Sequence, residues 1–314
     1  MTLRPPKKST SRLSRTVGYL GLALTAAALG AGAARLLGGV AGQVAHNFAE
    51  HNGVKTHYVS LGQGPLVVLI HGIPEFWYSW RQQIVPLAKA GFRVVAIDQR
   101  GFNRSSKPVK REAYATHEVV EDVAAVIRQE GYTKAHIVGH DAGALVAWLF
   151  ATLHPDLTDK LTILSVPHPN AFAEELATNP AQHEASAYAR GMQQEGARPA
   201  FRVGPIGVLR DPPGWPLYLA ADIRTDHQAI TAFYRLNYPR RPYPVNEVLP
   251  KVQAPTLVIH GRNDRFLLAS GHDRNGMWTE TEPRTVMLDA GHFVHQEKPR
   301  AVNQVLISWL SEAT

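Results

Sequence analysis

The chain has 314 residues, of which 45% are hydrophobic and 19% are charged. That length and composition predict one large globular α/β domain with room for an insertion, and they exclude a mainly disordered chain. The formal net charge of +7 includes five basic residues between positions 4 and 15, and no basic stripe interleaved with aromatic residues follows, so nucleic acid is excluded as a partner.

A basic leader and an apolar run occupy residues 1–45. The run at 16–34 carries no charge and is long enough to cross a bilayer. A basic start, an apolar middle and small residues at 31–33 are typical of a cleaved export signal, whereas an uncut segment would be a membrane-spanning anchor. We therefore expect the protein to be exported or membrane-anchored with its body outside the cytoplasm. The alternative is a mobile extension of a cytoplasmic protein.

Short apolar runs alternate with helical periodicity beyond this leader. Runs typical of buried strands lie at 66–70, 93–97, 135–139, 161–165, 256–260 and 284–288. Helical periodicity lies at 117–130 and 301–310. This order predicts an α/β fold in which a mostly parallel central sheet has helices on both faces.

The alternation stops between positions 167 and 250, where proline, glycine, tyrosine and arginine are frequent. We interpret 169–250 as an inserted helical cap, with the α/β core formed by 46–168 and 251–314. An insertion after a strand end lies above the carboxyl edge of the sheet, where open α/β folds bind ligands.

A sharp turn follows the predicted strand at 135–139. The sequence GHDAGA connects that strand to an apolar helix, which is the context of a nucleophile elbow with Asp141 at its apex. Gly139 and Gly143 flank the apex because a Cβ atom at either position would collide with nearby backbone. The pattern predicts Asp141 as a nucleophile.

A base and an orienting acid follow in the chain order expected of this elbow. His292 lies in a loop after the last predicted strand, and Asp264 lies in a loop after the strand before it. The acid would hold the imidazole in one tautomer and stabilise its charged form. His295 is the competitor for the base, and Asp289 is the competitor for the acid.

The sequence HGIPEFWYSW follows the first apolar strand and supplies the remaining parts of the predicted site. In this arrangement the backbone N–H groups of Ile73 and Ala142 would point together at a developing oxyanion. We expect four further side chains to line the substrate pocket: His71, Pro74, Trp77 and His140.

An aspartate nucleophile indicates attack at a saturated carbon. Its carboxylate, with an ordinary pKa near ~3.9, is already anionic at neutral pH. Serine would form an ether at such a carbon, which histidine and water cannot open, whereas Asp141 would form an ester that water activated by His292 can hydrolyse. The leaving group is then an epoxide oxygen, which needs proton donors, or a halide, which needs N–H donors.

From about residue 48 to its end the chain resembles the α/β-hydrolase epoxide hydrolases. The matching sequences are HGIPEFWYSW, DQRGFNRSSKP, GHDAGA, LSVPHPNAF, YxxxMQxxG, FYR, GRNDRF and GHFVHQEKP. The resemblance implies a small apolar epoxide and water as substrates, with Tyr188 and Tyr234 of the cap protonating the epoxide oxygen. It implies no cofactor and no metal, and it leaves the oligomeric state open.

Two departures from the family pattern accompany the resemblance. Ala142 stands where many relatives have an aromatic residue, which should enlarge that side of the pocket. Ala232 and Phe233 stand where an Asn-Trp pair is common before the second tyrosine.

Haloalkane dehalogenases share the same framework and are the main alternative. Their halide site uses Trp after the nucleophile and often Asn in the first motif, where this chain has Ala142 and Ile73. A more remote alternative is a non-catalytic exported binding protein, which would be expected to lack a member of the triad. The absence of cysteine excludes thiolate metal sites, and the histidines show no zinc-ligand spacing such as HExxH.

Overall fold

The computed structural model describes residues 39–203, 211, 214–246 and 248–313. The predicted signal or anchor at 16–34 lies outside this part of the chain and stays a prediction. Within the described part, no helix has the length and apolarity needed to cross a membrane.

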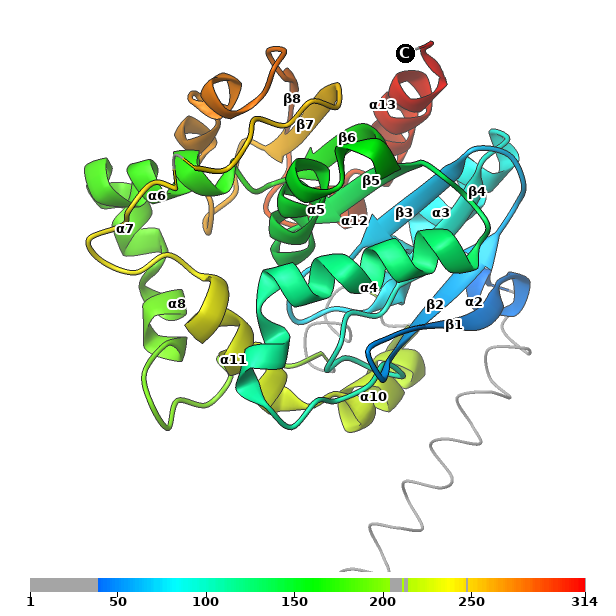
Figure 1. Ribbon diagram of the computed structural model, residues 1–314, viewed down its shortest axis with the longest axis horizontal. Coiled ribbons are helices and arrows are strands. Elements are labelled where there is room, and N and C mark those ends of the chain that lie inside the picture. The colour runs from blue at the N-terminus through cyan, green and yellow to red at the C-terminus, as the bar shows by residue number, and fades with distance from the viewer. Residues whose placement is uncertain (1–38, 204–210, 212–213, 247, 314) are drawn as a thin grey trace, which may run out of the picture.

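One eight-stranded sheet forms the centre of the molecule, in the order β1-β2-β4-β3-β5-β6-β7-β8 (Figure 1). Its strands are β1 (Ala45–His51), β2 (Val54–Leu61), β3 (Leu66–Ile70), β4 (Arg93–Ile97), β5 (Ala135–His140), β6 (Thr158–Leu164), β7 (Thr256–Gly261) and β8 (Arg284–Leu288). The β1/β2 and β2/β4 pairs are antiparallel, and all the other pairs are parallel. The predicted mostly parallel α/β sheet is confirmed.

Helices cover both faces of the sheet because the central strands are apolar on both sides. In β3, Val68 and Ile70 face one core while Val67 and Leu69 face the other. The first core is closed by α4 (Thr116–Gln129) and α5 (Ala142–Leu153), and the second by α3 (Arg81–Lys89) and α13 (Pro299–Ser311). The short helices α2 (Val40–Gln43) and α12 (Val294–Glu297) lie beside α3 and α13 respectively.

Sequence reasoning missed β1 and β2 and misjudged β8. Strand β2 buries polar side chains, and His57 is tolerated there because its Nδ1 lies 2.6 Å from the Asp98 carboxylate. A strand that buries polar side chains gives no apolar run to detect. Strand β8 was expected to be buried, but it is the edge of the sheet and its residues are partly or fully exposed.

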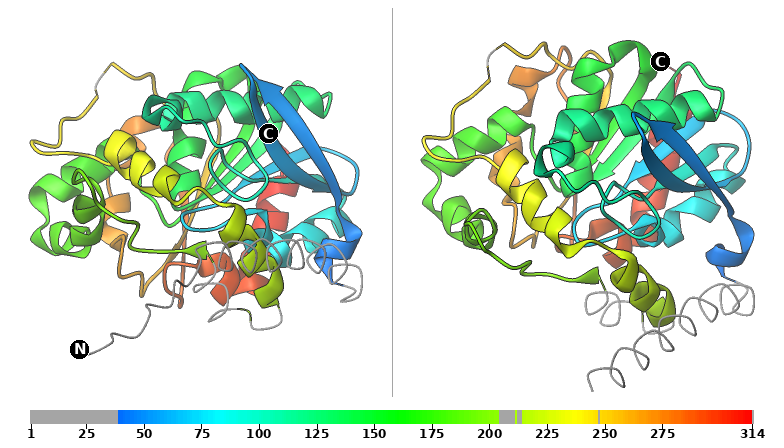
Figure 2. Two further views of the ribbon diagram at one scale, coloured as in Figure 1. Left: turned by 90° about the horizontal axis from the view of Figure 1, so that it is seen from below. Right: turned by 60° about the horizontal axis from the view of Figure 1, so that its bottom comes forward.

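Between β6 and β7 the chain forms a group of helices beside the sheet (Figure 2). They are α6 (Pro169–Thr178), α7 (Pro180–Ala185), α8 (Ala187–Met192), α10 (Trp215–Arg224) and α11 (His227–Asn237). Polar side chains cap the N-termini of α7 and α11. The Asn179 side chain accepts from backbone N–H groups of α7, and the Asp226 side chain accepts from the Gln228 N–H of α11. The division into a core (46–168 and 251–314) and a cap (169–250) remains a prediction.

Gly143→Ala is expected to lower the free energy of unfolding by about 1–3 kcal/mol, the usual cost of an overpacked site. A Cβ atom at this position would meet the carbonyl oxygens of Ile70 and His71, which are fixed in and beside β3. Gly191→Ala in α8 is the matched control, because its Cβ would have no neighbour within 4 Å. Urea unfolding followed by circular dichroism measures both changes, and equal effects of the two substitutions would contradict the steric explanation.

Candidate active site

Asp141 lies at the apex of a tight turn between β5 and α5. Its φ of 51° and ψ of −122° are rare for a residue with a side chain, which indicates a conformation imposed by its surroundings. A Cβ atom on Gly139 would collide with the Gly143 carbonyl oxygen, so the turn requires glycine there. Asp141 also immediately precedes the first turn of α5, where the helix dipole favours negative charge. The predicted turn is present with its strand and helix.

One residue from a distant loop, His292, meets the Asp141 side chain, and a second, Asp264, meets His292. His292 Nε2 lies 3.3 Å from Asp141 Oδ2, and His292 Nδ1 lies 2.7 Å from Asp264 Oδ2. The other oxygen of Asp264 accepts from two backbone N–H groups in its own loop. The competitor Asp289 is exposed and accepts from the Asn263 side chain instead. The structure therefore brings Asp141, Asp264 and His292 together, as the sequence predicts.

The imidazole of His292 is held in its charged form by the two carboxylates. Burial alone would lower the pKa of His292, but the Asp264 charge and the hydrogen bonds to Asp141 and Asp264 outweigh it and raise the pKa to about 10. Burial would likewise raise the pKa of both aspartates, but His292 lowers each of them below its ordinary value. The resting site is thus a buried cation between two anions.

A backbone N–H group contacts the second oxygen of Asp141. The Ile73 N–H donates to Asp141 Oδ1 at 2.8 Å, which places it where the sequence predicts an oxyanion donor. Gly72 permits this approach, because a Cβ atom there would lie 2.6 Å from the Asp141 Cβ. Ala142 is the first residue of α5 and lines the cavity beside Asp141.

Tyr188 on α8 and Tyr234 on α11 lie over Asp141. Their ring centroids are 6.1 Å apart, and both side chains line the same cavities as Asp141. Burial raises the pKa of each phenol well above its ordinary value, and the Asp141 charge adds to the effect. Both tyrosines are therefore neutral hydroxyl donors at any physiological pH.

Two cavities meet at Asp141, Tyr188 and Tyr234. The first has a volume of about 60 Å³ and the second about 200 Å³. The walls of the first are Ala142, Leu145, Val166, Pro169, Phe172, Phe233, Asn237, Tyr238, Pro239 and Leu267. The walls of the second are Ile73, Pro74, Phe201, Phe266, His292 and Phe293. Most of these side chains are apolar, so the site is suited to an apolar substrate with groups on both sides of the reacting atoms.

Of the four predicted pocket residues, Pro74 lines the second cavity, whereas His71, Trp77 and His140 line neither of the two cavities in the described part of the chain. His71 is fully buried and accepts from the Gln99 N–H through Nε2. Trp77 packs in the second core. His140 is the last residue of β5 and points beneath the turn. Proximity in sequence did not reveal which side of the strand ends faces the cavity.

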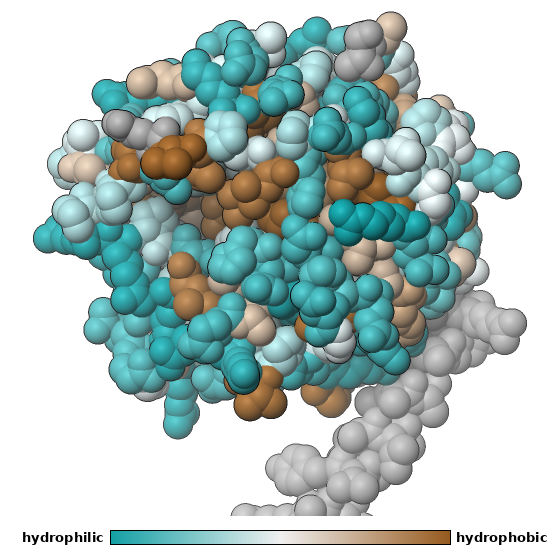
Figure 3. Space-filling model, in the orientation of Figure 1, coloured by the Kyte–Doolittle hydropathy of each residue, from teal (hydrophilic) through white to brown (hydrophobic). Residues whose placement is uncertain are grey.

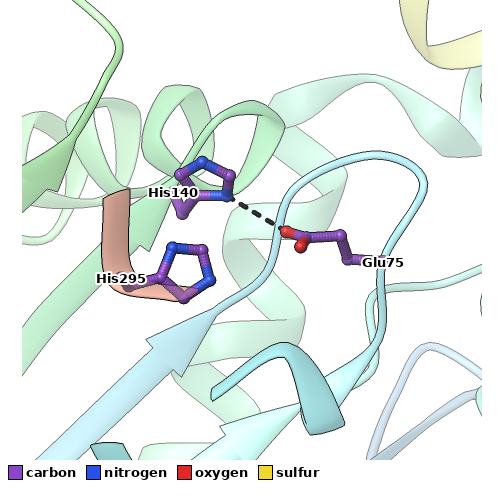
Figure 4. Close-up of side chains that lie close together, drawn as sticks. All are labelled: Glu75, His140 and His295. Atoms are coloured by element: carbon purple, nitrogen blue, oxygen red, sulfur yellow. Dashed lines mark hydrogen bonds and ion pairs between the residues drawn. The ribbon is translucent and has the colours of Figure 1, made fainter. Parts of the chain in front are cut away.

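Sequence reasoning missed a buried support under His292. Glu75 Oε2 lies 3.0 Å from His140 Nδ1 (Figure 4). The other Glu75 oxygen, Oε1, accepts from Gln296. His140 Nε2 lies 3.0 Å from the His292 carbonyl oxygen, which also accepts from the Ser165 hydroxyl at 2.9 Å. A carbonyl oxygen only accepts, so His140 donates there. The acidic residue Glu75 in HGIPE could have been noticed in the sequence, but its partners His140 and Gln296 come next to it only in the folded chain.

One group of side chains in the described residues could hold a metal ion, because its donor atoms all lie within 4.8 Å of one another. The group consists of Glu75, His140 and His295. All three side chains are buried. Burial would raise the pKa of Glu75, but the hydrogen bond and charge of His140 lower it. With both ring nitrogens of His140 already next to acceptors, this cluster is built as a hydrogen-bonded support.

Comparison with known proteins agrees with this fold. The model of the alpha/beta hydrolase fold family matches residues 65–299. Epoxide hydrolase 4 of Homo sapiens is 31% identical over 84% of this chain and 78% of its own length, and the AB hydrolase superfamily protein YfhM of Bacillus subtilis is 33% identical over 84% and 96%. A crystal structure of an epoxide hydrolase from Bacillus megaterium in complex with an inhibitor has a TM-score of 0.77 and 29% identity, covering 85% of this chain and all of that one.

His292 is expected to titrate near pH 10 instead of the ordinary 6.5, because two carboxylates hold its proton. The raised pKa contributes stability that is fully present below pH 6.5 and is lost as the pH rises through about 10. Asp264→Asn removes one of the charges and should lower the pKa. Nuclear magnetic resonance of protein labelled in its histidine rings follows both titrations, and an ordinary value in the unmodified protein would refute the charged resting state.

Proposed function

The chain belongs to the α/β-hydrolase fold family, in the group that contains epoxide hydrolases, and from this premise we propose that it opens an apolar epoxide to a vicinal diol through a covalent ester on Asp141. The observation that carries the proposal is the meeting of Asp141, Tyr188 and Tyr234 at the junction of two apolar cavities. A nucleophile and two proton donors then face the same bound group. The reaction needs water as its second substrate.

The first step is substitution at an epoxide carbon. A carboxylate oxygen of Asp141 forms a bond to this carbon while the bond from the carbon to the ring oxygen breaks. The ring oxygen takes a proton from Tyr188 or Tyr234, whose raised pKa keeps both phenols protonated until that moment. The product is a hydroxyalkyl ester on Asp141 and a tyrosinate.

Ester formation removes the negative charge of Asp141, which is one of the two that hold the His292 proton. The pKa of His292 therefore falls, and its released proton restores the tyrosine. The neutral imidazole, still oriented by Asp264, takes a proton from water. Asp141 changes from a nucleophile to an electrophile, and His292 changes from an acid to a base.

The second step is hydrolysis of the ester. Hydroxide adds to the carbonyl carbon of Asp141, and the N–H groups of Ile73 and Ala142 stabilise the oxyanion. The bond from this carbon to the product oxygen breaks, and the departing oxygen takes a proton from His292. The carboxylic acid of Asp141 then gives its proton to His292, which restores the resting ion pair. One epoxide and one water have become one diol.

A haloalkane dehalogenase would use the same triad, but the leaving-group side of this site fits an oxygen better. Neither cavity is lined by a tryptophan in the described part of the chain. The one side-chain amide in the first cavity, Asn237, is already bonded to Thr116 and Tyr114. Hydroxyl donors from Tyr188 and Tyr234 are what an alkoxide needs. The complete triad also argues against a purely binding role.

The function is tested by supplying the enzyme with an aryl epoxide and, separately, with a bromoalkane. We expect diol from the first and little bromide from the second. Substituting both Tyr188 and Tyr234 by Phe should lower diol formation by about 10²- to 10⁴-fold, the usual contribution of acid catalysis. Tyr132→Phe is the matched control, because the hydroxyl of Tyr132 donates to the Gly64 carbonyl oxygen, far from the site. Bromide without diol would assign the protein to dehalogenation.

His292→Gln is expected to separate the two steps. Asp141 can still be alkylated, but the base for water is gone, so the ester should accumulate. Intact-protein mass spectrometry should then show an increase equal to the mass of the epoxide, and Asp141→Asn should abolish it. An unmodified His292→Gln protein that demonstrably binds the epoxide would contradict this division of roles.

A further inference from the structure

Helix α10 exposes an apolar stripe. Its exposed residues are Trp215, Leu219 and Ile223, spaced four apart along one face, and their exposed fractions are 49%, 38% and 54%. The rest of the helix surface is buried through Tyr218, Ala220, Ala221 and Asp222. Figure 3 shows apolar residues at the lower edge of the molecule, over α10. An apolar patch on the outer face of a helix marks a site that another molecule or surface covers.

A basic loop adjoins the end of this stripe. The loop at 104–111 has the sequence RSSKPVKR and contains no acidic residue. Hydrogen bonds hold its start against the end of α10, from the Asn103 N–H to the Thr225 hydroxyl and from the Asp226 N–H to the Gly101 carbonyl. The loop is therefore fixed next to Ile223 and Arg224.

The exposed side chains of the loop combine charge with one apolar residue. Arg104, Lys107 and Lys110 are exposed, and Val109 at the tip is fully exposed. Burial lowers the pKa of Arg224, and the charge of Arg104 lowers it further. The two cations are therefore close enough to repel each other. The acidic neighbours include Asp226, whose side chain caps α11, Glu112, and Glu195, which pairs with Arg111 at 3.1 Å.

We propose that the α10 stripe and the 104–111 loop form a surface that rests on an anionic lipid bilayer. The stripe would lie among the acyl chains near the headgroups, and the cations would contact the lipid phosphates. The described chain begins at Gly39 beside α2, and both views of Figure 2 show α2 and α10 toward the same corner of the molecule. The 38 residues before it include the uncharged run at 16–34, which we propose is the membrane anchor or signal.

The charge of the surface selects lipid over a second copy of the chain. A twofold contact through this surface would bring two clusters of the same sign together, which disfavours association. Three apolar side chains also cover less area than the roughly 800 Å² per partner of a stable dimer. The helix that follows α10 is α11, which carries Tyr234, so the surface would hold the proposed active site close to apolar compounds dissolved in the bilayer.

The absence of cysteine from the chain allows a direct test. Leu219→Cys places a single fluorescent label on the stripe, and Met277→Cys places it on an exposed apolar site elsewhere, as the control. The full-length protein is mixed with vesicles of phosphatidylcholine and phosphatidylglycerol in equal parts. We expect quenching by aqueous acrylamide to fall several-fold at position 219 and to stay unchanged at 277. Adding Arg104→Gln and Lys110→Gln should restore much of the quenching at 219.

Three results would overturn the proposal. The first is that the protein floats with the vesicles while the label at 219 stays as accessible as that at 277, which would mean that residues 16–34 alone hold it. The second is that the label at 219 is shielded before vesicles are added, which would assign the stripe to another part of the chain or, if light scattering shows a dimer, to a second copy. The third is absence of vesicle binding. None of these results depends on catalysis, so the proposed function is tested separately.

Discussion

A charged imidazole held between two carboxylates is the interaction on which the rest of the site depends. His292 contacts Asp141 through one ring nitrogen and Asp264 through the other, and each partner is most stable when the others keep their charge. Three buried charges would be costly apart, because each loses its hydration. Together they keep Asp141 anionic and ready to attack. The same pairing makes the state of His292 depend on whether Asp141 carries a charge.

The fold holds this interaction in place from below. Strand β5 and helix α5 impose a positive φ on Asp141, and the glycines around it allow the backbone to approach closely. The carbonyl oxygen of His292 accepts from both His140 and Ser165, and Glu75 fixes His140 in turn. The sheet thus positions nucleophile and base independently of the helices above them. Those helices contribute the two tyrosines and the apolar walls.

Features formed by residues that are neighbours in the sequence could be predicted, whereas features formed by distant segments could not. Asp141 was identifiable because strand, turn and helix are contiguous, and Asp264 and His292 because each follows a strand end. Strand β2 was missed because its buried His57 is paired with Asp98 from a distant segment. His71 and His140 line neither cavity at Asp141, since the direction of a side chain at a strand end depends on packing that sequence spacing does not contain.

In the proposed mechanism, Asp141 itself supplies one of the two oxygen atoms of the diol. The direct measurement is a single turnover in oxygen-18 water, with enzyme in excess over an aryl epoxide, followed by mass analysis of the diol and of the peptide that contains Asp141. If the ester forms, the diol from this first turnover should be unlabelled and the heavy oxygen should lie in the Asp141 carboxylate. Heavy oxygen in the diol and none in Asp141 would mean that water attacks the epoxide directly, and would contradict the ester mechanism.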